Sequence, residues 1–176
     1  MKRKNILKVA TATAVLAALG ATVYAQDKYS LKSPSEIAFS DFKGYEEWAV
    51  VSSARTDEVL KVIVANPAMI EAYKAGVPGN GRPFPEGSKI VKLQWKPKKS
   101  TEAPFVVDVP DVFTQAFVIE KDSQRFPNTG GWGYALFNFD AADGSFTADP
   151  APADCGHSCH VAVKSKDYIF HPYQQR

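Results

Sequence analysis

The fold is decided by residues 112–139, which read VFTQAFVIEKDSQRFPNTGGWGYALFNF. Residues 112–119 and 132–139 are both rich in β-branched and aromatic side chains, which favour half-buried strands. Between them, residues 126–131 gather proline, asparagine and glycine, the residues that end strands and form turns. This stretch therefore predicts two strands joined by a turn.

Three further runs of this kind lie upstream, at residues 49–53, 59–64 and 89–95. Five strands with few helices predict an α+β domain that is dominated by an antiparallel β-sheet. No internal repeat interrupts this pattern.

Helix signals are fewer and more local. Asn66 suits an N-cap, Pro67 the first helical position and Gly76 the position after a helix, so a helix is predicted over residues 68–75. Residues 45–48 predict one helical turn before the first strand.

The C-terminal part of the chain predicts a loop and then a helix. Residues 141–154 are rich in Ala, Pro, Asp and Gly, which favours a loop over the surface or over a ligand. Residues 156–170 can form a helix, with Pro172 ending it.

Residues 1–25 are typical of a secretory signal peptide, with a basic start, an apolar run at 9–19 and a small-residue exit. A membrane anchor is the alternative, but a spanning helix needs about 20 mostly apolar residues. Cleavage after residue 25 leaves 151 residues. That length predicts one domain over residues 39–176, behind a flexible lead-in at residues 26–38.

The charge balance changes once the signal is removed. The signal holds four of the 21 Lys and Arg residues and no acid, which leaves 17 basic and 19 acidic residues. A formal charge of −2 without a basic stripe gives no electrostatic reason to expect a nucleic-acid partner.

The two cysteines of the chain, Cys155 and Cys159, lie near the C-terminus, and His160 directly follows the second. A c-type haem is attached through C-x-x-C-H, and here one extra residue separates the cysteines. Gly156 offers backbone freedom to absorb it. A short Cys155–Cys159 disulfide in a haem-free domain, and a zinc or copper site that adds His157, remain alternatives at this point.

The run CGHSCH at 155–160 is followed by KDYIF at 166–170, and upstream stand YEEW at 45–48, FPEG at 84–87 and GWGYALF at 131–137. In this order the motifs resemble the cytochrome P-460 family, in which a haem motif precedes an Asp-aromatic-Val-Phe stretch. The resemblance covers most of the predicted mature chain.

The resemblance implies an exported bacterial protein, commonly a homodimer, with one covalent haem c on Cys155 and Cys159. His160 would be the proximal iron ligand, opposite an open site for a small nitrogen species. Family members called cytochrome P-460 oxidise hydroxylamine, with a soluble electron-transfer partner as acceptor, and carry a lysine joined to the haem. Relatives called cytochrome c′-beta lack that bond and bind nitric oxide in an apolar pocket.

Two positions bear on this difference. Lys92 matches the cross-linking lysine, although by its residues alone it also fits a solvated strand lysine that shares a face with Ile90. The hydroxylamine-oxidising members place a glutamate shortly before the haem motif, whereas residues 146–154 contain none. Asp154 is the nearest acid and the candidate distal base.

The remaining candidates are aromatic and imidazole side chains. His157 and His171 are expected to be exposed rather than to bind iron. Seven aromatic residues are expected mainly as sheet core, with a haem-pocket wall as the alternative: Phe39, Trp48, Phe113, Phe117, Trp132, Tyr134 and Phe137.

Overall fold

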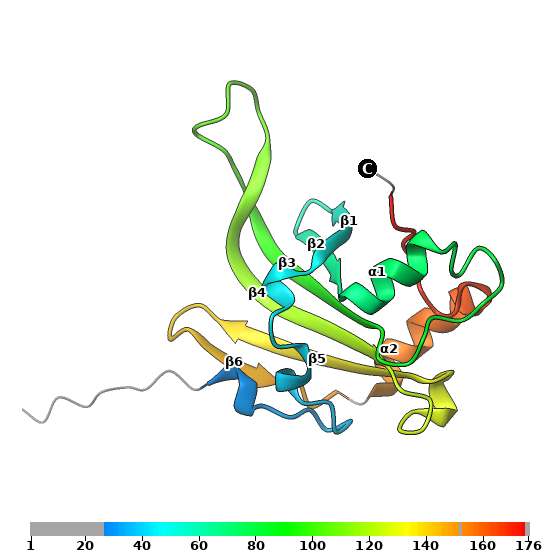
Figure 1. Cartoon of the computed structure of the whole chain (residues 1–176). Helices are drawn as coiled ribbons and strands as arrows, with labels where there is room; N and C mark the ends of the chain where they lie inside the picture. The colour runs from blue at the N-terminus through cyan, green and yellow to red at the C-terminus, as the bar shows by residue number, and fades with distance from the viewer. Residues whose placement is uncertain (1–26, 152, 175–176) are drawn as a thin grey trace, which may run out of the picture.

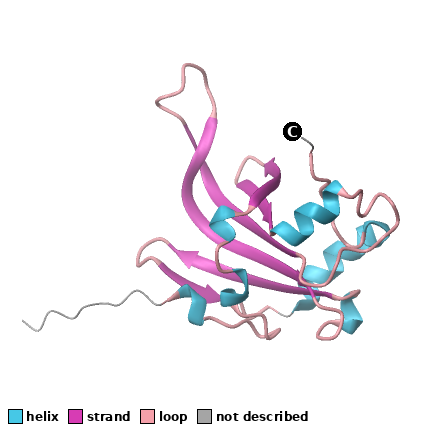
Figure 2. Cartoon of the chain, viewed as in Figure 1, coloured by secondary structure: helices cyan, strands magenta, loops and turns pink. Residues whose placement is uncertain are grey.

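The computed structural model describes residues 27–151 and 153–174, apart from the side chains of residues 153–155. The signal expected at residues 1–25 lies outside this part. Its centre is a six-stranded antiparallel sheet in which each strand pairs with the next along the chain (Figures 1 and 2). The strands are β1 (Ala49–Arg55), β2 (Leu60–Ala65), β3 (Lys89–Lys99), β4 (Asp108–Lys121), β5 (Trp132–Asp140) and β6 (Ser145–Ala148).

The helices are short. The α-helices are α1 (Pro67–Lys74) and α2 (Ala153–His160), and the 3-10 helices are η1 (Lys28–Ser30), η2 (Phe39–Phe42), η3 (Tyr45–Glu47), η4 (Pro127–Thr129) and η5 (Val161–Lys166). None of the helices in the described part is long and apolar enough to cross a membrane. The α+β, sheet-rich fold expected from the sequence is confirmed.

All five expected strands form, and a sixth forms where a loop was expected. β6 lies within residues 141–154 and pairs with the end of β5, with Phe146 opposite Phe139. No local signal predicts β6, because four residues are too few to show alternation and the edge of β5 supplies its hydrogen bonds.

Helix α1 forms where its caps predict it. The Asn66 side chain accepts a hydrogen bond from the amide of Met69, Pro67 is the first helical residue, and Gly76 follows with a positive φ of 88°. The C-terminal helix is shorter than expected. α2 ends at His160, and a 3-10 helix follows instead of a continuous α-helix to residue 170.

The sheet is apolar on both faces, and each face has its own core. One face packs against α1 and the C-terminal segment, through side chains that include Ile63, Ile90 and Ile119. The other packs against residues 29–48 and includes Val91 and Val118. Period-two alternation along β3 and β4 explains this division.

The segment expected as a loosely packed lead-in is part of the second core. Ile37 is fully buried, and residues Lys32 and Ala38 form an isolated β-bridge. The Arg125 guanidinium also donates to the carbonyl of Glu36. The polar composition of this segment hides its packing, because Tyr29 and Leu31 also lie against the core that contains Ile37.

Candidate functional site

A cavity opens on the face of the sheet that α1 and α2 border, and its wall is set by strand register. Lys92 on β3 is paired with Ile63 on β2 and with Phe117 on β4, so these three side chains form one row across the sheet. The next row on the same face contains Ile90 and Ile119. All five side chains line the cavity.

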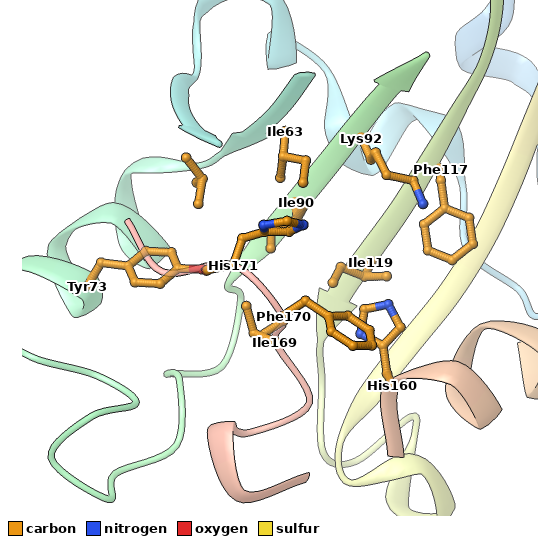
Figure 3. A pocket seen from close by; sticks show the side chains of 11 residues that line it. Ile63, Tyr73, Ile90, Lys92, Phe117, Ile119, His160, Ile169, Phe170 and His171 are labelled. Carbon is orange, nitrogen blue, oxygen red and sulfur yellow. The ribbon is translucent and has the colours of Figure 1, made fainter. Parts of the chain in front are cut away.

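The rest of the lining comes from outside this sheet centre. Val51 lies at the irregularity in the β1–β2 register, Tyr73 belongs to α1, and three side chains come from the C-terminal segment, Ile169, Phe170 and His171. The cavity volume is about 90 Å³, room for a molecule of only a few non-hydrogen atoms. Figure 3 shows Lys92 entering from β3 and His160 from the end of α2.

His160 is held in a fixed orientation. Its Nδ1 donates to the backbone carbonyl of Tyr168 at 2.5 Å, and the Phe170 ring packs edge-on against the imidazole at 4.9 Å between centroids. Burial lowers the pKa of His160, which favours the neutral ring. With its proton on Nδ1, the neutral ring has a free lone pair on Nε2, the state that binds a metal.

Lys92 is not the solvated strand lysine that its residue type allows. Its Nζ lies 4.5 Å from the centre of the Phe117 ring, a cation–π distance. Burial lowers the pKa of the Lys92 ammonium, and the positive charge of Lys61 lowers it further. The site therefore holds an amine that loses its proton more readily than a surface lysine.

Gly156 allows helix α2 to lie against the sheet. A Cβ on Gly156 would lie 2.7 Å from the Cβ of Tyr134, closer than real contacts allow. The sequence reasoning expected this glycine to supply backbone freedom, whereas in the structure it lies inside a helix and supplies space. The Tyr134 ring packs 5.1 Å from the His160 ring, between centroids.

An ion pair with little solvent exposure joins β4 to the C-terminal segment and was not identified from the sequence. Lys121 Nζ lies 2.9 and 3.2 Å from the two carboxylate oxygens of Asp167, and their side chains are 6% and 11% exposed. Asp167 belongs to the KDYIF run, but no local pattern links it to a lysine on β4. Only the packing of the C-terminal segment joins the two.

The other histidines differ from expectation. His171 lines the cavity and is partly buried, with Nδ1 at 3.3 Å from the Ser52 hydroxyl. His157 is also partly buried, and its Nδ1 and the Tyr134 hydroxyl are buried without a hydrogen-bond partner among the described residues. The expectation of two exposed histidines is wrong, because their neighbours in sequence say nothing about what the C-terminal segment packs against.

The expected aromatic core is confirmed at most positions. Phe39 and Phe137 pack in the second core, with ring centroids 4.6 Å apart, and Trp132 and Tyr134 in the first. Phe117 alone among the seven lines the cavity.

Of the two cysteines in the haem motif, the structure describes the side chain of one. Cys159 is free and exposed, one residue before His160. The side chains of Asp154 and Cys155 lie outside the described part, so the distal base and the first thioether remain predictions. Among the described side chains, no cluster of three His, Cys, Asp or Glu residues could hold a metal ion by itself.

The donor atoms fit a haem. An oriented neutral imidazole, an adjacent exposed thiol and an apolar wall are the groups that ligate and attach a c-type haem. A porphyrin exceeds the cavity volume, so the cavity itself matches a small ligand, and the fit to haem rests on the donors beside it. Fold and site together define a sheet-based protein of the haem-binding class.

The family comparison gives the same assignment. The sequence model of the cytochrome P-460 family matches residues 42–171, and the chain therefore belongs to that family. The family implies a haem cofactor. No protein of curated function matches the sequence.

Proposed function

We propose that the chain is an exported, periplasmic cytochrome with one haem c, joined to Cys155 and Cys159 and ligated by His160, which oxidises hydroxylamine. The observation that carries this proposal is that Lys92 and His160 line one cavity whose other walls are largely apolar. Family membership makes haem the cofactor, and the Lys92 amine is the group expected of the hydroxylamine-oxidising members.

The haem, when bound, supplies an iron with an open coordination site and the redox chemistry. The chain's own residues supply ligation, orientation and access. His160 donates from Nε2, while Tyr168 fixes the ring through Nδ1. The apolar wall excludes water and admits a ligand of the size of hydroxylamine.

Lys92 contributes the covalent link to the haem ring. A neutral amine is the nucleophilic form, and burial makes that form more accessible. Forming this link would remove one hydrogen from the Lys92 amine and one from the haem ring, so it would need a two-electron oxidant such as a peroxide, which would be reduced to water.

Hydroxylamine oxidation releases protons and electrons together. The electrons pass to a one-electron acceptor, a soluble redox protein. The protons need an acceptor in the cavity, and no carboxylate lines it among the side chains that the structure describes, which do not include Asp154. Burial lowers the pKa of His171, so its neutral imidazole can take a proton there.

The test is a set of variants in the holoprotein. Lys92→Met should remove the red-shifted ferrous absorption band that a lysine cross-link produces, and should leave the haem attached after denaturation. Lys98→Met is the control, since Lys98 is an exposed lysine of the same strand, paired with Asp111 at 3.0 Å. A red-shifted band that survives in Lys92→Met would show that Lys92 is not the cross-link.

A second candidate function is nitric oxide binding without turnover, as in cytochrome c′-beta. In the described part of the chain the cavity is lined by no carboxylate, which favours it. In that case the unchanged protein would show no red-shifted band, would bind nitric oxide in the ferrous state, and would not reduce an acceptor when given hydroxylamine.

Two further parts of the proposal have their own measurements. The intact mass of exported protein should match a chain that starts at Gln26 plus one haem, and a colourless product would instead support the haem-free disulfide alternative. Sedimentation should give twice the chain mass, because we propose a homodimer.

A further inference from the structure

The Lys121–Asp167 pair has every one of its strong hydrogen-bonding groups engaged. Besides the two carboxylate contacts, Lys121 Nζ donates to the carbonyl of Gly130 at 2.9 Å. The Asp167 carboxylate also accepts from the amide of Phe84 at 2.8 Å. A buried pair with such complete satisfaction has one geometry, because any departure leaves a charge buried and unpaired.

Asp167 is also the first residue of an unusual turn. Asp167 and Tyr168 both have left-handed backbones, with φ of 48° and 63°. A Cβ disfavours this conformation, and two such residues in a row need support from outside the turn. The carboxylate of Asp167, held by β4 and by the segment before β3, supplies such support, in addition to the backbone hydrogen bonds of the turn itself.

The turn sets the direction of one carbonyl. Tyr168 presents its carbonyl oxygen to His160 Nδ1, at 2.5 Å. The Tyr168 ring fixes the same residue from its other end, since it lies so close to Gly130 that a Cβ there would be 2.2 Å from it. A continuous series of contacts thus joins Lys121 to Asp167, and the backbone of Asp167 and Tyr168 to the His160 imidazole.

We propose that Lys121 and Asp167 are positioning residues that set the donor strength of the His160 ligand. A well-aligned Nδ1–H···O bond increases the electron density on Nε2 and stabilises ferric over ferrous iron. Neither residue of the pair lines the cavity, and the pair acts through the Tyr168 carbonyl. This inference rests on the proposed ligation of haem by His160.

The test compares two carboxylates with little solvent exposure, each of which pairs with a lysine. Asp167→Asn keeps the size of the side chain and removes its charge. Glu120→Gln is the matched control, because Glu120 is buried beside Lys121 and pairs with Arg125 and Lys89, away from the cavity. Both variants should lower the melting temperature of the holoprotein.

Only Asp167→Asn should change the strength of the iron–histidine bond and the reduction potential of the haem. We expect a lower iron–histidine stretching frequency in the ferrous protein, and a tenfold larger ratio of ferrous to ferric haem at a fixed potential. For a one-electron couple that ratio is a rise of ~59 mV. Equal effects in the two variants, or an unchanged frequency and potential in Asp167→Asn, would refute the inference.

If Asp167→Asn does not fold, a second variant tests the same inference. Lys121→Met with Asp167→Leu replaces the pair by apolar side chains, a change that buried pairs often tolerate. It should fold and still show both shifts, and wild-type values in it would overturn the inference. If the unchanged protein shows no iron–histidine band, the proposed ligation fails instead, so the two failures are distinguishable.

Discussion

The contact between Gly156 and Tyr134 gives a prediction whose magnitude follows from the structure. Gly156→Ala adds a methyl group whose carbon would lie 2.7 to 2.9 Å from three atoms of Tyr134. Those atoms are the Cβ, Cγ and Cδ1 of Tyr134, a residue that is 2% exposed. Overpacking of this kind costs about 1–3 kcal/mol.

An opposing effect comes from the helix. Alanine inside a helix is about 1 kcal/mol more favourable than glycine. The net expectation is therefore a loss of ~1 kcal/mol in the free energy of unfolding. Since α2 carries Cys159 and His160, its displacement should also broaden the haem absorption bands.

The assay is denaturant unfolding of the holoprotein, with Gly79→Ala as the matched control. A Cβ on Gly79 meets nothing closer than a carbonyl oxygen at 3.4 Å, and its φ is not positive. That variant should be unchanged or up to ~1 kcal/mol more stable, because alanine restricts the unfolded chain. A Gly156→Ala protein as stable as the wild type would show that α2 does not lie as close to β5 as described.

Two further predictions concern the second core and the cavity. Ile37→Ala should lower the free energy of unfolding by about 2–5 kcal/mol, because Ile37 is fully buried. The same unfolding assay measures this loss, and a value below about 0.5 kcal/mol would mean that residues 27–38 are not packed on the sheet. His171→Phe should slow hydroxylamine oxidation by about 100-fold if His171 takes the proton, without changing the haem spectrum. Tyr73→Phe, which removes only the hydroxyl that donates to the His171 carbonyl at 2.9 Å, should have a much smaller effect. Equal rates in wild type and His171→Phe would exclude His171 as the proton acceptor.

Local sequence was a sound guide where the signal is carried by neighbouring residues. Asn66, Pro67 and Gly76 gave the ends of α1 to within a residue, because caps act on the backbone beside them. Turn residues in the same way separated the five strands that were expected. β6 had no such signal, since its pairing partner is the edge of β5.

The candidate site likewise has features that follow from local sequence and others that depend on distant residues. That Lys92 shares a face with Ile90 follows from strand alternation alone, and the CGHSCH run marks His160 as the candidate ligand. Whether that face is buried could not be known, because the residues that cover it, 160 and 169–171, lie between 68 and 79 positions after Lys92. Burial, and with it the pKa of Lys92, is a property of that packing.

The sequence by itself determined five of the six strands, the first helix, the family and the candidate ligand His160, because each depends on residue type and short spacing. Tertiary structure alone decided that Lys92 and His160 meet in one cavity, that His171 joins them, and that Lys121 and Asp167 hold the turn behind His160. The physical reason is that desolvation and hydrogen-bond geometry depend on groups brought together across the sheet, which no local pattern records.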